Sequence, residues 1–276
     1  MRTRHPARTQ AFTRIEALAL VATILLLALL SFPVAANNRA QTKATLCFSN
    51  MRHLIFAWQL YATDHDGILV GNTFGSETQS ATNSWWARGY MDWSTASANT
   101  NMSFIRDPRQ ARLANYILTP RNVHKCPADT FQSAAQRTRG IVRVRSVAMN
   151  STIGALDAQN PFADPRYRHA RTMAQLYNPS PAESTVFLEE HPDSINDPLL
   201  FAPLAQRWID FPASYHQGAG GVTFADGHVG LHSWRTARIR NAKVHYFFNL
   251  NGNVPRGDPD LTWMSYSCQR TGPQTF

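Results

Sequence analysis

The sequence predicts an α+β fold in which one long amino-terminal helix precedes an antiparallel β-sheet domain. Three observations lead to this prediction. Residues 17–36 form an uncharged, largely apolar run, residues 40–61 continue it as an amphipathic helical stripe, and short strand-like segments follow from residue 141 onwards. With 276 residues the chain is long enough to bury a substantial core.

The apolar run has the length of a membrane span. A helix over residues 17–36 would measure roughly 30 Å, which is the thickness of the hydrocarbon core of a bilayer. Arg2, Arg4 and Arg8 precede the run, and the positive-inside rule then places the first residues in the cytoplasm. We therefore expect a single membrane-spanning helix with the globular domain outside the cytoplasm.

Three kinds of segment share this composition: a secretory signal peptide, an uncleaved anchor and a prepilin leader. Residues 34–36 (Val-Ala-Ala) offer a signal-peptidase site that would release a chain starting at Asn37. The apolar run is longer than the roughly 7–15 residues of a usual signal peptide. Glu16 also has no role in a signal peptide, because a carboxylate at a membrane edge costs free energy unless it is paired.

Residues 11–16 (AFTRIE), followed by the apolar helix, resemble the processing site of type IV prepilins and type II secretion pseudopilins. The resemblance implies that a prepilin peptidase cuts between Ala11 and Phe12 and methylates the new amine. It also implies that Glu16 pairs with the terminal amine of a neighbouring subunit. In the same family a proline kinks the helix, and Pro33 occupies that place.

This resemblance implies a pilin-like architecture, in which one helix has a membrane half and an amphipathic half packed on the sheet domain. Two positions depart from the family pattern: Ala11 stands where glycine is usual, and Arg14 stands where leucine is usual. The implied segments are a leader (1–11), a transmembrane helix (12–36), an amphipathic continuation (37–66) and a globular extracytoplasmic α+β domain (67–276).

The amphipathic stripe follows the apolar run at alternating spacings of four and three residues, which is typical of one face of an α-helix. Its members are Ala40, Ala44, Cys47, Met51, Leu54, Trp58 and Tyr61. We expect this face to pack on the globular domain and the helix to end near Gly67. Two separate helices broken at Pro33 remain the alternative.

Strands are expected at about 141–149, 184–190, 220–226, 228–234 and 243–249. Asp226-Gly227 predicts a two-residue type I′ hairpin turn, which would set Phe224 opposite Val229. A short helix is expected around 109–117.

The hairpin also carries a second resemblance. His216, nine further residues and then Asp226-Gly227 resemble the carboxy-terminal signature of planctomycete and verrucomicrobial prepilin-like proteins. Residues 186–197 and 208–216 resemble internal segments of the same group, so the resemblance covers most of the chain.

The three cysteines, Cys47, Cys126 and Cys268, have no CxxC spacing, which argues against a zinc knuckle or a thioredoxin-type site. Cys47 and Cys126 lie in segments that resemble the family, and we expect a disulfide between them with Cys268 left over. Three reduced, buried cysteines are the alternative.

Four histidines near acidic residues are weak candidates for metal ligands, although a structural role is the simpler interpretation. They are His191, His216, His228 and His232. No catalytic serine elbow, phosphate loop or HExxH motif occurs in the sequence, so we expect neither an enzyme nor a cofactor.

The net charge of +9 reflects few acids rather than many bases. Arginines at 137, 139, 143 and 145 are expected on a solvated face, with no specific nucleic-acid partner.

The expected function is that of a prepilin-like subunit of a type II secretion pseudopilus or a type IV pilus-like filament, anchored in the inner membrane before assembly. Its expected partners are a prepilin peptidase, other pilin-like subunits and an inner-membrane assembly platform. The alternative is a membrane-tethered extracytoplasmic binding module that uses pilin-type export without forming filaments.

Overall fold

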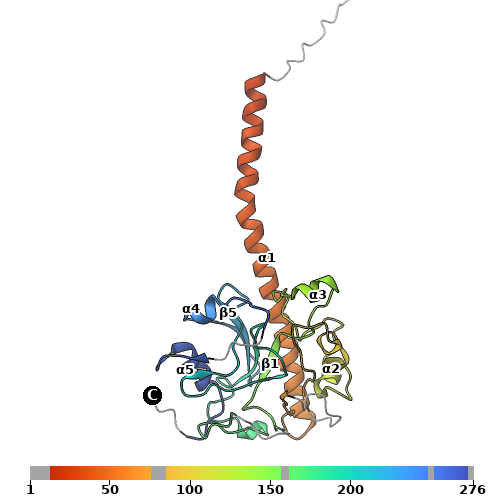
Figure 1. Cartoon of the computed structure of the whole chain (residues 1–276), viewed down its shortest axis with the longest axis vertical. Coiled ribbons are helices and arrows are strands. Elements are labelled where there is room, and N and C mark those ends of the chain that lie inside the picture. The colour runs from red at the N-terminus through yellow and green to blue at the C-terminus, as the bar shows by residue number, and fades with distance from the viewer. Residues whose placement is uncertain (1–12, 76–84, 157–161, 248–251, 273–276) are drawn as a thin grey trace, which may run out of the picture. The chain divides into compact units, whose positions relative to one another are not determined.

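The computed structural model describes residues 13–75, 85–156, 162–247 and 252–272, with residues 28–40 described by their backbone only. The chain divides into two compact units, Met1–Thr42 and Lys43–Phe276. Figure 1 traces the elements in chain order.

The first element is the helix α1, which runs from Arg14 to Asp64. A reciprocal cap begins it: the Thr13 backbone N–H donates to Glu16 Oε2 at 2.8 Å, and the Glu16 N–H donates to Thr13 Oγ1 at 3.3 Å. The helix ends where Gly67, with a positive φ of 81°, donates its N–H to the Ala62 carbonyl at 2.8 Å. The expected helix end near Gly67 is confirmed.

Within the described residues, no helix combines the length and the apolar character needed to cross a membrane. The predicted transmembrane helix over 12–36 is therefore corrected, and with it the single-pass location in the inner membrane and the membrane half of the pilin-like fold class.

The β-sheet has five strands in the order β3-β1-β2-β5-β6. Their bounds are β1 Val147–Asn150, β2 Thr185–Glu189, β3 Leu199–Leu200, β5 Ala219–Phe224 and β6 Val229–Ser233. β3 pairs in parallel with β1, whereas all other neighbours are antiparallel. The predicted fold class is therefore corrected here as well: the fold is α+β, but its sheet is mixed, because the chain leaves β2 and returns beside β1 in the direction of β1.

Short elements surround this sheet. A second, two-stranded sheet joins β4 (Arg207–Trp208) to β7 (Gly252–Asn253). The α-helices are α2 Ser103–Arg106, α3 Ala134–Thr138, α4 Ala237–Arg240 and α5 Pro259–Tyr266. The 3₁₀ helices are η2 Ser97–Asn99, η3 Arg112–Tyr116 and η4 Met173–Gln175. Residues 243–247 form no strand, and the rest of the strand expected over 243–249 lies outside the described residues.

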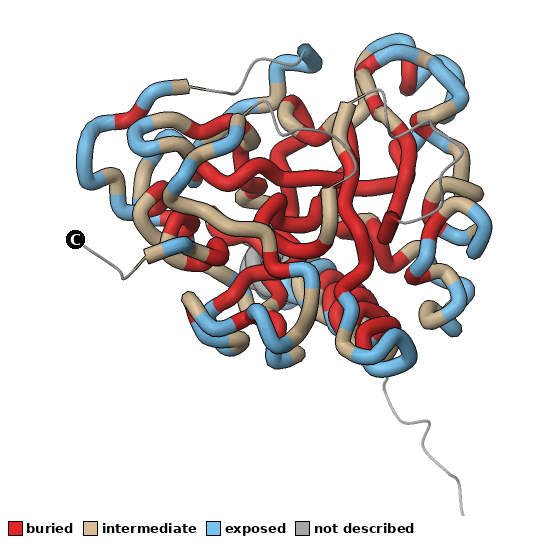
Figure 2. Tube along the Cα trace, turned by 90° about the horizontal axis from the view of Figure 1, so that it is seen from below, coloured by how far each residue is buried: buried red, intermediate tan, exposed pale blue. Residues whose placement is uncertain are grey.

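Two hydrophobic clusters cover the two faces of the sheet. The carboxy-terminal half of α1 packs Met51, Leu54 and Trp58 against Met149 and Phe187 of the sheet. The opposite cluster joins α5 and the β4 region to residues of β1, β2 and β5, which are Ala148, Leu188 and Val222. Buried residues occupy the central segments in Figure 2, and exposed ones follow the peripheral loops. The predicted stripe is buried from Cys47 to Tyr61, in agreement with its helical spacing.

The β5–β6 hairpin has a different register from the predicted one. Thr223 pairs with Val229 and Val222 pairs with Gly230, so Phe224 lies opposite His228. The loop therefore has three residues instead of two, and its last residue, Gly227, has a positive φ of 97°. The predicted two-residue type I′ turn is wrong.

The turn of this hairpin rests on α1. Gln59 Nε2 donates to the Ala225 carbonyl at 3.2 Å. A Cβ on Gly227 would lie 2.9 Å from both Gln59 Nε2 and Gln59 Oε1. Asp226 Oδ1 accepts the His228 N–H at 3.0 Å and closes the turn from the other side. The Asp-Gly pair thus shapes a turn that fits against the helix.

Replacing Gly227 with alanine is expected to destabilise the Lys43–Phe276 unit by about 1–3 kcal/mol, because the side chain adds backbone strain and displaces Gln59. Gly257→Ala is a matched control, since Gly257 also has a positive φ (77°) but a Cβ there would meet no atom within 4 Å. Denaturant unfolding of both variants measures the difference. Equal losses would mean that the Gln59 contact contributes nothing.

Candidate functional site

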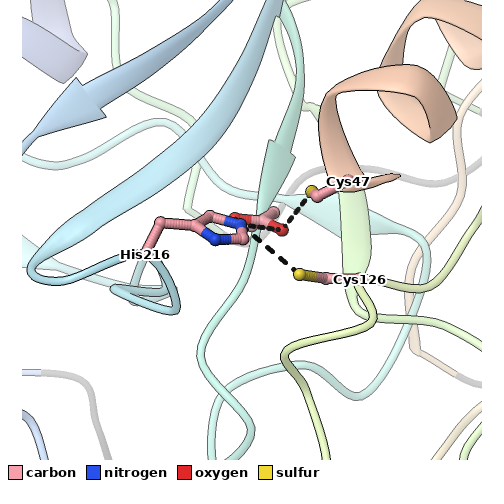
Figure 3. A group of neighbouring side chains, drawn as sticks. Cys47, Cys126 and His216 are labelled. Carbon is pink, nitrogen blue, oxygen red and sulfur yellow. Dashed lines mark hydrogen bonds and ion pairs between the residues drawn. The ribbon is translucent and has the colours of Figure 1, made fainter. Parts of the chain in front are cut away.

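Four side chains with metal-ligand chemistry meet beneath α1. Cys47 comes from α1, Cys126 from the loop before α3, Glu189 from the end of β2 and His216 from the loop before β5. One potential ligand atom from each residue lies within 4.8 Å of the others. Figure 3 shows His216 facing Cys47 and Cys126 from the opposite side of the group. We call these four residues the buried cluster.

Glu189 contacts both Cys47 and His216 within the buried cluster. Its Oε1 accepts a hydrogen bond from the Cys47 thiol at 2.7 Å and lies 3.2 Å from His216 Nε2. Its Oε2 accepts the Gly221 N–H at 2.7 Å. A Cβ on Gly221 would lie 3.2 Å from Glu189 Cδ, so glycine lets β5 approach the carboxylate closely.

Cys126 is positioned by its own backbone contacts. Its N–H donates to Ser146 Oγ at 2.7 Å, and its Sγ accepts the Ala128 N–H at 3.3 Å. The sulfur lies 3.5 Å from His216 Nε2. A backbone N–H directed at the sulfur favours a negatively charged thiolate there.

The charges of the buried cluster depend on one another. Burial lowers the pKa of His216, but its contacts with Cys126 and Glu189 outweigh burial and raise that pKa to about 10. Burial raises the pKa of Glu189. The hydrogen bond and charge of His216, together with hydrogen bonds to Cys126 and Cys47, more than reverse this, so that the pKa of Glu189 is lowered. The hydrogen bond between the two cysteines lowers the pKa of Cys126. The same hydrogen bond, together with burial, raises the pKa of Cys47. A carboxylate, an imidazolium and one ionisable thiol therefore share this site.

The geometry does not suit a nucleophilic triad. In a triad the acid orients the histidine through one ring nitrogen while the other nitrogen faces the nucleophile. Here the same atom, His216 Nε2, faces both Cys126 and Glu189. The side chains of His216 and Glu189 are only 4% and 0% exposed, and Cys126 is buried, so a substrate has no direct access to them.

The structure brings together the two cysteines of the predicted disulfide. Cys47 and Cys126 are free thiols, as is Cys268. Cys268 lies elsewhere in the core, 3.4 Å from Asn150 Nδ2, and burial raises its pKa to about 12. The disulfide between Cys47 and Cys126 stays a prediction, because neighbouring thiols are compatible with an oxidised or a reduced pair.

Of the four histidines predicted as weak metal candidates, only His216 lies in the buried cluster. His191 accepts the Asp193 N–H on its Nδ1 at 3.1 Å, and burial lowers its pKa to about 4. His228 stacks on Phe224 and contacts Asp226 Oδ1 at 2.6 Å. His232 stacks on Trp263.

His232 gives the fold an acid-sensitive contact. Its ring centroid lies 3.6 Å from that of Trp263 and 4.5 Å from that of Trp234. Burial lowers the pKa of His232 to about 4, with Asp260 opposing the shift and Arg235 adding to it. The unfolded chain takes up this proton near pH 6.5, whereas the folded chain takes it up near pH 4.

The free energy of unfolding is therefore expected to fall between pH 6.5 and pH 4, by at most about 1.4 kcal/mol per pH unit from this one proton. His232→Phe keeps a ring on Trp263 and removes the titration, so its stability should fall less steeply over the same range. Unfolding curves followed by circular dichroism measure both slopes. Parallel slopes for the two proteins would contradict the assignment to His232.

Glu189 was not predicted as a site residue. It ends β2 after four buried residues, and a second acid, Glu190, comes directly after the strand; both acids are buried. Successive strand residues point to opposite faces, so one of two adjacent acids must face each layer of the core. Two acids at the end of a largely apolar strand were the available signal, since buried carboxylates need a partner.

The remaining predicted site residues lie at the amino terminus. Ala11 and Phe12, the predicted processing site, lie outside the described residues. Glu16 accepts two hydrogen bonds from Thr13 on its Oε2, and these bonds lower its pKa. Pro33 lies within α1, in the part described by its backbone only, so the predicted kink is not tested.

No protein-family model, curated protein or solved structure matches the chain.

Proposed function

We propose that the chain is a pilin-like structural subunit that assembles with other copies, or with related subunits, into a filament. The observation that carries the proposal is the apolar surface at the start of α1. Eight large apolar side chains there are between 53% and 79% exposed. They are Ile15, Leu18, Leu20, Val21, Ile24, Leu25, Leu26 and Leu27.

These side chains surround the helix instead of forming one stripe. Successive residues of an α-helix are rotated by about 100°, so positions 24, 25, 26 and 27 alone point in four different directions. A single neighbouring helix covers only one stripe, about 100° wide, of the helix surface. Several copies packed around each helix would cover all of it, as in the core of a helical filament.

The free energy that this packing is expected to contribute to association is large. Fully burying one leucine, isoleucine or valine side chain contributes roughly 1.5–3 kcal/mol. Even partial burial of the eight side chains could offset the loss of rotational and translational freedom on association. The role proposed for this segment is therefore structural.

Glu16 supports the same proposal. Both hydrogen bonds from Thr13 end on Oε2, so Oε1 has the capacity to accept a bond from a neighbouring subunit. Cleavage between Ala11 and Phe12 would create a positively charged amine a few residues before this carboxylate. A prepilin peptidase and a filament assembly platform are the partners that this proposal requires.

Crosslinking of the full chain tests the proposal. A Leu18→Cys, Leu27→Cys variant places two thiols on opposite sides of the segment, because nine residues correspond to about 180° around a helix. Contacts with more than one copy should then give ladders larger than dimers under mild oxidation. The matched control is Leu118→Cys, Val142→Cys, whose side chains are 91% and 53% exposed in the globular unit. Ladders from the first variant alone are expected. Monomers from both, or equal ladders from both, would overturn the proposal.

Glu16→Ala in the Leu18→Cys, Leu27→Cys background tests the carboxylate separately. Weaker ladders are expected if Glu16 pairs with a neighbour's amine, and Glu16→Gln should behave like the alanine variant because it also lacks the charge. Ladders of unchanged strength in both variants would restrict Glu16 to capping its own helix.

A further inference from the structure

We propose that the buried cluster binds one divalent transition-metal ion, with zinc as the ion that fits best. This inference is independent of filament assembly, since all four ligands belong to the Lys43–Phe276 unit. The buried cluster consists of Cys47, Cys126, Glu189 and His216.

The separations between the ligand atoms fit a tetrahedral ion. Zinc bonds of about 2.3 Å to sulfur and about 2.0–2.1 Å to nitrogen or oxygen place neighbouring ligand atoms roughly 3.3–3.8 Å apart. Cys126 Sγ and His216 Nε2 are 3.5 Å apart, and His216 Nε2 is 3.2 Å from Glu189 Oε1. The closest pair, Cys47 Sγ and Glu189 Oε1 at 2.7 Å, needs to separate by less than about 1 Å.

The donor set selects the class of metal. Two sulfurs, one imidazole nitrogen and one carboxylate oxygen suit a borderline-soft ion such as zinc. Calcium and magnesium require a shell of oxygen atoms, which this site does not provide. Binding would displace the thiol protons and the imidazolium proton, because each ligand coordinates in its deprotonated form.

The surroundings hold the ligands as a metal site requires. The Gly221 N–H fixes the outer oxygen of Glu189, and the Ala128 N–H is directed at the Cys126 sulfur. Contacts of this kind orient ligands and stabilise thiolates in metal sites. The Ser146 hydroxyl anchors the backbone of Cys126 as well.

Four protein ligands would close the coordination sphere, which is typical of structural zinc sites and leaves no position for a substrate. The ligands come from α1, from the end of β2 and from two loops, and they are far apart in the sequence. The ion would therefore join the helix to the sheet and to both loops. A disulfide between Cys47 and Cys126 would join only the helix and one loop, and it would leave the Glu189–His216 pair as it is.

Metal analysis of the full chain, purified without chelators and with zinc chloride in the growth medium, tests the proposal. We expect about one zinc per chain in the wild type and in Cys268→Ser, a matched buried cysteine outside the buried cluster. Cys126→Ser and His216→Ala should lose most of the metal. Metal-free wild type, or equal metal in Cys126→Ser and the wild type, would overturn the proposal.

A variant that fails to fold would lose the metal for that reason alone. A metal titration of the wild-type chain is therefore a second test. Wild-type chain stripped with a chelator and reduced is titrated with cobalt chloride, which reports tetrahedral sulfur coordination by its visible and near-ultraviolet absorption. Saturation at one equivalent, with zinc displacing the cobalt signal, is expected. Absence of the signal in the reduced chain, or a Cys47–Cys126 disulfide found by non-reducing peptide mapping of the untreated chain, would contradict a metal role.

Discussion

Trp58→Ala is expected to lower the free energy of unfolding by about 3–5 kcal/mol, among the largest effects of any single substitution. Trp58 lies on α1 with 0% of its surface exposed, in the cluster that joins this helix to the sheet. Removing its indole leaves a cavity that the surrounding helix and strands cannot close fully. Denaturant unfolding followed by circular dichroism gives the size of the loss.

Two further substitutions sharpen this test. Trp58→Phe should cost much less than the alanine variant, because it keeps most of the ring and removes a buried indole N–H that has no hydrogen-bond partner among the described residues. Phe56→Ala, two residues earlier on the same helix, removes a side chain that is 60% exposed and should change the stability little. Equal losses for Trp58→Ala and Phe56→Ala would show that α1 does not pack on the sheet as described.

Arg145→Met is expected to cost about 3–5 kcal/mol, although methionine fills a similar volume. Arg145 is fully buried, and its guanidinium donates to the carbonyls of Asp197 and Val147 at 2.6 and 3.3 Å, and to that of Gly89 at 3.3 Å. The substitution leaves these acceptors without a donor, and it removes the positive charge beside a group of buried carboxyls.

The same substitution has a measurable electrostatic consequence. Burial raises the pKa of Asp197 to about 6, and the charge of Arg145 holds it below the value that burial alone would give. The pKa of Asp197 is therefore expected to rise further in Arg145→Met. Arg145→Lys keeps the charge but not the forked geometry, so its stability should lie between that of the wild type and that of Arg145→Met. Arg137→Met, at an exposed arginine in the same segment, should be nearly neutral, and a similar loss there would contradict the assignment.

Arg145 also shows where reasoning from the sequence was wrong. Arg137 and Arg139 are exposed as expected, but Arg143 and Arg145 are buried. Arg143 donates to the Pro192 carbonyl at 2.9 Å and lies over the ring of Trp93. A run of arginines in a sequence indicates charge but not the carbonyls that bind it, which here come from distant loops.

The predictions that held depend on local patterns. The stripe on α1 repeats every three or four residues, and such a period determines which face of a helix is buried whatever it packs on. The glycine at the helix end likewise needs only its own positive φ. The predicted hairpin register was wrong by one residue, and the turn contacts Gln59, which is far away in the sequence and which the local pattern does not include.

The candidate site depends on the opposite kind of information. Cys47, Cys126 and His216 were each singled out, but as members of different hypotheses, a disulfide and a group of histidines. Glu189 joins them in space across 142 residues of sequence from Cys47. Only the fold brings these segments together, because Cys47 of α1 contacts Glu189 at the end of β2.

The mature amino terminus, measured by intact mass spectrometry of chain recovered from assembled material, tests the proposed function most directly. A pilin-like subunit retains the apolar start of α1, so we expect a chain that begins with methylated Phe12. A chain that begins at Asn37 would lack residues 13–27 altogether, and with them the surface proposed to hold the filament together. That result would contradict the proposed function.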